Sequence, residues 1–200
     1  CSADTDRTAT APDREVPVTA PIPANEAQRL IELESFGVLD TPPEQVFDDI
    51  TFLASHIYET PIALMSLVDQ DRQWFKSSIG LAVPETHRDL AFCAHAIWEP
   101  TEVMVVEDAA YDERFSNNPL VVADPSIRFY AGAPLQTSAG NALGTLCIID
   151  RVPRQLDAGE ELALAALARL AVNELEMRRA LLSISDQLDR AAMEIGRAHV

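Results

Sequence analysis

Cys93 and His95 are the residues of this 200-residue chain whose types and spacing most readily support chemistry. A thiol beside an imidazole can act as a nucleophile, and the two can also bind a metal ion. In a helix, side chains two residues apart point about 200° apart, so this pair would share neither a metal ion nor a proton. In a loop, both would be free to face a cavity. Three uses of Cys93 stay open: core packing, cavity lining, and covalent attachment or redox sensing.

Aromatic residues suited to stacking on a planar ligand occur in two expected strands. In the first, period-2 alternation places Trp74 and Lys76 on one face and Phe75 on the other. Either one face packs against a helix while Lys76 extends to solvent, or Trp74 or Phe75 stacks on a ligand. In the second expected strand, Phe129 and Tyr130 alternate in the same way.

An apolar cavity with a few convergent polar groups is the usual form of a small-molecule site. One of Phe129 and Tyr130 should face such a cavity, with Arg128 near its rim and His95 as a further polar group. The ligand-binding candidates are Trp74, Phe75, Phe92, Cys93, His95, Arg128, Phe129 and Tyr130.

The sequence contains no recognisable catalytic motif. It has no Walker-type glycine loop, no Gly-x-Ser-x-Gly and no His-Glu-x-x-His. Cys1, Cys93 and Cys147 are too few and too scattered for a zinc site or a disulfide scaffold, and Cys147 is expected in the core. The acidic residues between 107 and 113 are expected to form a solvated surface. We therefore predict neither a catalytic residue nor a metal site.

The acidic balance of the chain argues against whole classes of partner. It has 15 Lys and Arg against 32 Asp and Glu, a formal net charge of −17, and a pI near 4.4. Nucleic acids and anionic membrane surfaces need a basic face, so neither is expected as a partner. The sequence also lacks an apolar run of about 18–20 residues that would span a membrane. We expect a cytoplasmic domain.

Hydrophobic periodicity predicts an α+β fold built mainly from hairpins. Apolar residues at helical spacing predict helices over 27–34, 41–57, 86–98 and from 157 past 188. Thr41, with prolines and Glu44 after it, is the expected cap of the second helix. Apolar or alternating runs predict strands over 62–68, 73–79, 103–106, 128–135 and 142–150, with a long connection over 109–127. Hairpin-linked strands predict an antiparallel sheet with helices packed on it.

Several segments together resemble bacterial GAF domains of the kind found in sensor histidine kinases, diguanylate cyclases and phosphatases. They are residues 39–44, 62–76, 92–97, 128–135 and 144–150. The likeness covers about residues 25–178. It implies a PAS-related antiparallel sheet of about six strands with helices on both faces and a long C-terminal helix. It also implies a cavity between the sheet and a crossing loop-helix segment, and a regulatory role rather than catalysis.

Three chemistries of this family lack their motifs here. Bilin-binding relatives have a histidine directly after their cysteine, whereas Ala94 separates Cys93 from His95. The cysteine set of the methionine-sulfoxide-reducing branch is absent from the sequence. The cyclic-nucleotide motif of the phosphodiesterase branch is not recognisable either. The resemblance thus leaves the ligand and any cofactor unknown.

The last predicted helix carries an apolar seam beyond the expected end of the sheet. Met177, Leu181, Ile184, Leu188 and Ala191 follow a heptad pattern. A two-stranded coiled coil explains such a seam, so we expect a homodimer. We also expect a fused output domain, a histidine kinase, diguanylate cyclase or phosphatase, that this chain does not contain.

The chain is expected to divide into four segments. Residues 1–24, rich in proline and polar residues, are expected to be a disordered leader. The GAF-like domain covers 25–178, and a signalling helix covers 179–194. Residues 195–200 match the translation of a common sequencing adapter and are expected to be foreign.

These observations favour a regulatory sensory module in bacterial signal transduction, including two-component systems. It would bind a small molecule or sense redox state, and relay a conformational signal through its C-terminal helix. Two alternatives stay open: a thiol-dependent reductase using Cys93, and a ligand-free dimerisation spacer.

Overall fold

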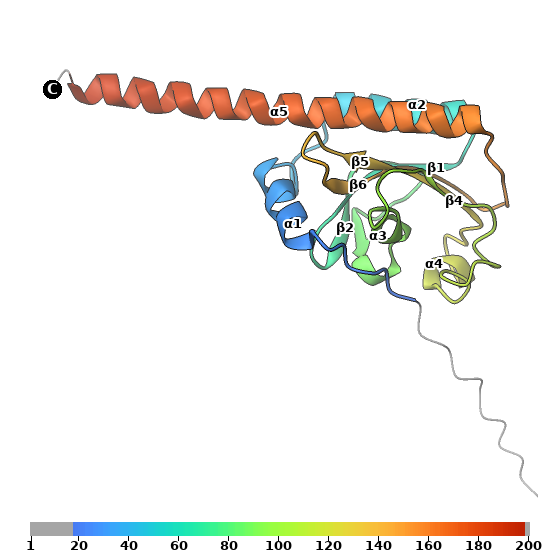
Figure 1. Cartoon of the computed structure of the whole chain (residues 1–200). Coiled ribbons are helices and arrows are strands. Elements are labelled where there is room, and N and C mark those ends of the chain that lie inside the picture. Colours follow the sequence, from blue (N-terminus) through green and yellow to red (C-terminus); the bar gives the residue numbers. More distant parts are fainter. Residues whose placement is uncertain (1–17, 199–200) are drawn as a thin grey trace, which may run out of the picture.

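A computed structural model describes residues 18–198 of the chain. It shows the predicted fold, a six-stranded antiparallel sheet with helices on both faces and a long C-terminal helix (Figure 1). Residues 1–17 of the expected leader and 199–200 of the expected foreign end lie outside the described residues. The strand order is β3-β2-β1-β6-β5-β4. The elements are α1 (Glu26–Ser35), α2 (Gln45–Tyr58), β1 (Ile62–Val68), β2 (Arg72–Ile79), β3 (Glu85–His87), η1 (Arg88–Leu90), α3 (Phe92–Ala96), β4 (Met104–Val106), α4 (Pro119–Val122), β5 (Phe129–Gln136), β6 (Ala142–Asp150) and α5 (Ala158–Ala198).

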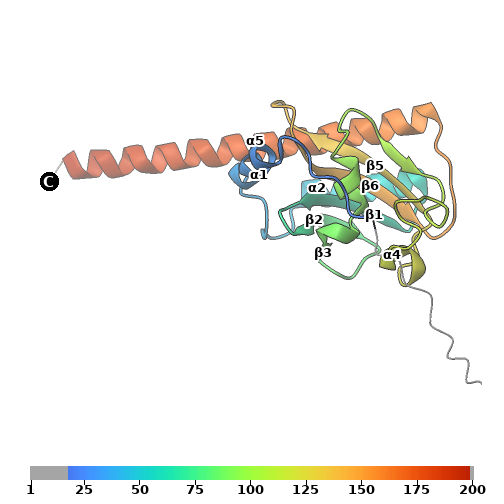
Figure 2. The same ribbon diagram turned by 60° about the horizontal axis from the view of Figure 1, so that its bottom comes forward.

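The sheet separates two apolar cores. Helices α2 and α5 cover one face, and α3 and α4 lie on the other (Figures 1 and 2). Trp74 and Phe129 belong to the core under α2 and α5, whereas Phe75 and Tyr130 belong to the core under α3. This division is the predicted period-2 alternation, because successive side chains of a strand point to opposite faces.

Segment 86–98 is not the single helix predicted. Thr86 pairs with β2 as part of β3, η1 follows, and α3 begins only at Phe92. Between them Ala91 has an extended backbone, with φ −80° and ψ 119°, which interrupts any continuous helix. The His87 ring accepts a hydrogen bond from the Asp89 backbone N–H and so caps η1. The break turns the segment across the sheet.

Thr41 and Lys76 also depart from the predicted roles. Helix α2 begins at Gln45 and not at Thr41, whose hydroxyl donates to the Val38 carbonyl and accepts from Lys76 Nζ. The Lys76 side chain, predicted to reach solvent, is fully buried and bonds Glu44 Oε1 at 2.6 Å. It needs these partners because an unpaired buried charge costs several kcal/mol.

Helix α5 is both part of the core and an extension beyond it. Its 41 residues span about 60 Å. The first half packs on the sheet through residues that include Leu164, Leu167 and Leu175. The second half runs past the sheet and past α1 (Figure 1). No helix within residues 18–198 is long and apolar enough to cross a membrane.

Candidate functional site

A cavity of about 300 Å³ lies between the sheet and the segment that crosses it, on the side of α3 and α4. This is the size at which small-molecule sites begin. Its apolar wall includes Leu64, Phe75, Phe92, Leu120, Tyr130 and Ile149. Strands β1, β2, β5 and β6 supply the floor, and β3, the start of α3 and α4 supply the roof.

Two buried polar atoms of the cavity wall lack a hydrogen-bond partner within residues 18–198. They are Gln73 Oε1, on a side chain of a residue only 5% exposed, and Thr86 Oγ1. An unsatisfied buried polar group costs about 1–3 kcal/mol, so each atom would gain a hydrogen bond if its side chain turned towards a bound molecule. The charged residues lining the cavity within the described chain are Glu85 and Asp124, with no Lys or Arg. The lining therefore suits a neutral or cationic hydrogen-bond donor better than an anion.

Cys93 lines the cavity, and its sulfur is surrounded by hydrogen-bond donors. The hydroxyl groups of Thr145, Ser66 and Tyr130 donate to Cys93 Sγ at 2.9, 3.1 and 3.3 Å. Gly132 makes room for this arrangement, because a Cβ at that position would overlap the Tyr130 hydroxyl.

The two buried thiols differ in electrostatic environment. Burial raises the pKa of Cys93, but the hydrogen bonds from Cys147, Ser66, Thr145 and Tyr130 outweigh it and bring the pKa below the usual thiol value. Burial raises the pKa of Cys147, and the neighbouring Cys93 sulfur raises it further. Of the two, Cys93 is the one that more readily carries a thiolate.

The structure brings together only half of the eight predicted ligand-binding residues. Phe75, Phe92, Cys93 and Tyr130 line the cavity. The other four do not. Trp74 and Phe129 point to the opposite face of the sheet, into the core under α2 and α5, so a molecule in this cavity would not touch them.

Arg128 and His95 also lie outside the cavity. Arg128 precedes β5 and pairs with Asp108 at 3.8 Å. His95 lines a separate groove of about 680 Å³, where its Nε2 is 3.2 Å from the Val18 carbonyl oxygen. Burial lowers the pKa of His95, and the charge of Arg114 lowers it further. As predicted for their spacing, Cys93 and His95 form no pair.

Gln73 and Thr86 are cavity residues that the sequence interpretation missed. The signal for Gln73 was present, because a residue two positions before Phe75 shares its face in a strand. Thr86 had no such signal, since its segment was predicted to be a helix.

Residues 18–24, expected to belong to the leader, lie against the cavity side of the domain. Ala20 packs against the core under α3, and Pro23 is buried. The groove that holds His95 is lined in part by Val18, Thr19 and Pro21.

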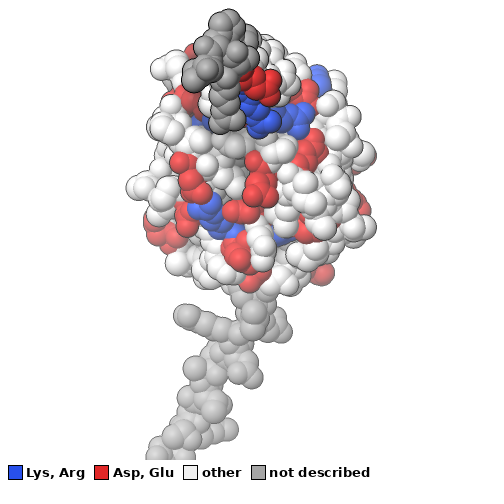
Figure 3. Space-filling view, turned by 90° about the vertical axis from the view of Figure 1, so that its left-hand side faces the viewer, with Lys and Arg blue, Asp and Glu red and all other residues white. Residues whose placement is uncertain are grey.

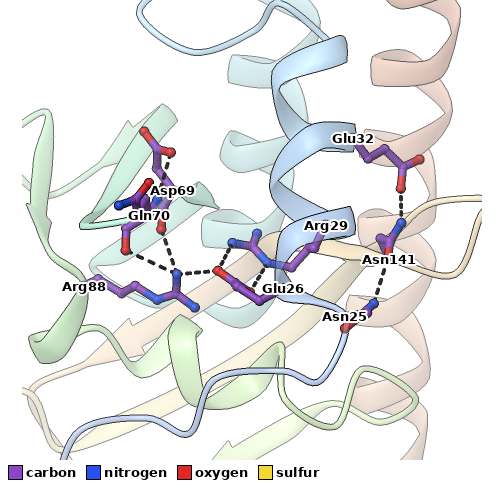
Figure 4. Close-up of polar contacts among 8 residues, drawn as sticks. All are labelled: Asn25, Glu26, Arg29, Glu32, Asp69, Gln70, Arg88 and Asn141. Carbon is purple, nitrogen blue, oxygen red and sulfur yellow. Dashed lines mark hydrogen bonds and ion pairs between the residues drawn. The ribbon is translucent and has the colours of Figure 1, made fainter.

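A buried ion cluster ties α1 to the cavity roof (Figure 4). The Glu26 carboxylate accepts two hydrogen bonds from Arg29, at 2.7 and 2.8 Å, and one from Arg88 at 2.5 Å. Arg88 also donates to the carbonyl oxygens of Asp69 and Gln70 in the β1–β2 turn. The cluster thus holds η1, directly before α3, against α1 and the turn.

Comparison with known proteins assigns the family. The model of the GAF domain matches residues 42–175, which is more than half of the chain. The chain belongs to the GAF domain family. Within residues 18–198, this GAF domain has no group of three or more His, Cys, Asp or Glu residues placed to hold a metal ion.

The GAF domain is similar in sequence to part of a larger bacterial protein. It is 44% identical over 162 residues to a cyclic di-GMP phosphodiesterase from Pseudomonas aeruginosa. That match covers 80% of this chain but 27% of the relative, so the chain spans about a quarter of that protein's length.

Two solved structures share the fold at low sequence identity. One is a domain of a two-component sensor histidine kinase protein from Sinorhizobium meliloti, with a TM-score of 0.59 and 18% identity, covering 71% of this chain and 97% of that one. The other is the GAF domain of a phosphoenolpyruvate-protein phosphotransferase from Acinetobacter, with a TM-score of 0.58 and 15% identity, covering 78% and 96%.

Proposed function

We propose that this GAF domain is a regulatory module that binds a small, uncharged or cationic molecule in the cavity. The observation that carries the proposal is the pair of buried, unpartnered polar atoms, Gln73 Oε1 and Thr86 Oγ1, on two residues of a mainly apolar cavity wall. A ligand donor facing Gln73 would remove the cost of leaving that acceptor unpaired. The face of the domain seen from the C-terminal side of α5 displays more acidic than basic side chains, in keeping with the acidic composition of the chain (Figure 3).

A short chain of contacts connects the cavity to α5. Gln73 and Phe75 line the cavity from β2, and Lys76, the next residue of that strand, points to the other face of the sheet. There Lys76 Nζ and Arg178 Nε both donate to Glu44 Oε1, at 2.6 and 3.0 Å. A ligand that shifts β2 would therefore act on Arg178, at the point where α5 leaves the domain. In this proposal α5 carries the change to an output domain.

We propose that the output side of this GAF domain works as a dimer of two copies. The heptad residues Met177, Leu181, Ile184 and Leu188 are 53–66% exposed. They continue the α5 surface next to exposed apolar residues of α2 such as Val46, with which Met177 and Leu181 share a groove. A second copy aligned in parallel would place the same residues opposite one another, which is the geometry a heptad seam serves. The larger size of the Pseudomonas relative supports a fused output domain.

Filling the cavity should abolish ligand retention. Native mass spectrometry of the chain, incubated with a small-molecule extract of bacterial cells, is expected to show a bound mass. Leu120→Trp places a larger side chain in the cavity wall and should lose that mass, whereas Leu162→Trp, at a residue 69% exposed on α5, should keep it. A wild-type chain that retains nothing would favour the ligand-free spacer, and equal retention by both variants would place the ligand elsewhere.

Adding a charge to the seam should separate the two copies. Leu188→Glu buries an unpaired carboxylate in the proposed coiled coil, so we expect the dimer dissociation constant to rise about tenfold or more. Gln187→Glu adds the same charge beside the seam and serves as the control. Sedimentation equilibrium measures both. A wild-type chain that stays monomeric at high micromolar concentration would refute the dimer.

A further inference from the structure

Cys93 and Cys147 are two free thiols buried on the cavity side of the sheet. Cys93 lies on α3 and Cys147 on β6, and their Sγ atoms are 4.0 Å apart. A disulfide requires about 2 Å between the sulfurs, so rotation of the side chains must bring them about 2 Å closer. Cys93 lines the cavity from α3 and Cys147 belongs to the same apolar core, so rotation of the Cys93 side chain changes the cavity wall.

The sulfur of Cys93 is expected to react before that of Cys147. Three hydroxyl groups donate to Cys93 Sγ, and this arrangement stabilises the thiolate, which is the reactive form of cysteine. The residue also lines the cavity, with only 1% of its surface exposed. The cavity is therefore the route through which a small oxidant would approach Cys93.

We propose that Cys93 and Cys147 form a reversible disulfide when a small peroxide enters the cavity. The Cys93 thiolate attacks one peroxide oxygen, the O–O bond breaks, and the leaving oxygen takes up the thiol proton, which leaves Cys93 as a sulfenic acid. The Cys147 sulfur then attacks Cys93 Sγ, the S–O bond breaks, and the hydroxide leaves as water with the Cys147 proton. Two electrons from the two thiols reduce the peroxide, and a thiol reductant reverses the bond.

The disulfide needs the cavity only as an entry route and does not rest on the proposed ligand. Ligand retention and disulfide formation are measured separately, so a negative result in one test does not contradict the other proposal. The two are expected to influence each other, because Cys93 forms part of the wall that a ligand would contact.

The test uses the full chain carrying Cys1→Ser, so that the third cysteine cannot link two copies. The chain is exposed to hydrogen peroxide, denatured in N-ethylmaleimide and weighed intact. We expect both thiols to become unavailable to the maleimide and the mass to fall by two hydrogen atoms. Trypsin without reductant should then release one joined pair of peptides, 89–114 with 129–151. Dithiothreitol should restore both thiols.

Variants assign the order of reaction. With Cys147→Ala, Cys93 should stop as a sulfenic acid that dimedone traps once the chain is denatured, whereas with Cys93→Ala the remaining Cys147 should stay alkylatable. Thr145→Val removes the closest hydroxyl donor at nearly constant volume and should slow disulfide formation about tenfold. Thr51→Val is the matched control, because its buried hydroxyl donates to Phe47 on α2, away from the sulfurs.

Several results would overturn the proposal. One is a wild-type chain whose two buried thiols stay fully alkylatable after a peroxide exposure that oxidises glutathione in a parallel tube. Another is a crosslink between different chains, and a third is unchanged reactivity in Thr145→Val. The wild-type experiment shows whether the Cys93–Cys147 disulfide forms even where a variant fails to fold.

Discussion

Glu26→Gln should lower the free energy of unfolding by about 3 kcal/mol or more. In the wild-type chain the Glu26 carboxylate is the shared partner of Arg29 and Arg88, which are 1% and 6% exposed. The variant keeps the shape of the side chain but leaves two buried guanidinium groups without their counter-charge, which typically costs about 3–5 kcal/mol. Urea unfolding followed by circular dichroism measures the loss.

The loss of stability caused by Glu26→Gln should depend on pH. Burial alone would raise the pKa of Glu26, but hydrogen bonds from Arg29 and Arg88, and their charges, lower it from 4.5 to about 2. Because the folded-state pKa is the lower one, the stabilisation is fully present above pH 4.5 and is lost as the pH falls towards 2. The shift corresponds to about 3 kcal/mol. The difference in the free energy of unfolding between wild type and Glu26→Gln should therefore become smaller as the pH falls below 4.5.

Glu34→Gln is the control, since Glu34 is an exposed glutamate on the same helix. It should change stability by about 0.5 kcal/mol or less. If Glu26→Gln behaved like Glu34→Gln, or kept a constant deficit from pH 7 down to pH 3, the carboxylate would not be the counter-charge that holds the cluster together.

The sheet was predictable because its signal is local. Alternation in β2 and β5 predicts that neighbours such as Phe75 and Lys76 lie on opposite faces, and the structure shows this. The choice of face was not predictable in the same way. Trp74 and Phe129 became ligand-binding candidates because alternation does not say which face bears the cavity. That depends on where α2 and α5 pack, which is a property of the whole chain.

The roof of the cavity was harder to predict, because its geometry comes from distant contacts. The apolar residues over 86–98 do follow helical spacing. The structure instead pairs β3 with β2, and Arg88 donates a hydrogen bond to Glu26, 62 residues earlier in the chain. Tertiary pairing therefore overrode the local preference. Likewise Thr41 carries a capping hydroxyl, but the buried Lys76 ammonium uses it. The short helix α4 begins where Asn118 accepts from the Leu120 N–H, a signal hidden within a long polar connection.

Gly144→Ala should destabilise the domain by about 3 kcal/mol or more. Gly144 lies in β6 opposite Leu67 of β1, at the centre of the sheet. A Cβ at this position would overlap the Ser66 carbonyl oxygen and the Leu67 Cα, which are backbone atoms of the neighbouring strand. Neither can move without separating the central strand pair, so the cost lies at or above the upper end of ordinary overpacking. Chemical unfolding curves for the variant and wild type provide the measurement.

Gly159→Ala is the matched control for this glycine. Its Cβ would lie 3.1 Å from Asp157 Oδ1, which accepts a hydrogen bond from the Glu160 N–H at the start of α5, and no backbone atom of a neighbouring strand is close. The control should therefore shift the unfolding midpoint in urea much less than Gly144→Ala does. Because Thr145 and Cys147 follow Gly144 on β6, a folded Gly144→Ala chain should also form the Cys93–Cys147 disulfide more slowly. Wild-type stability in Gly144→Ala would mean that β1 and β6 are less tightly paired than this close approach requires.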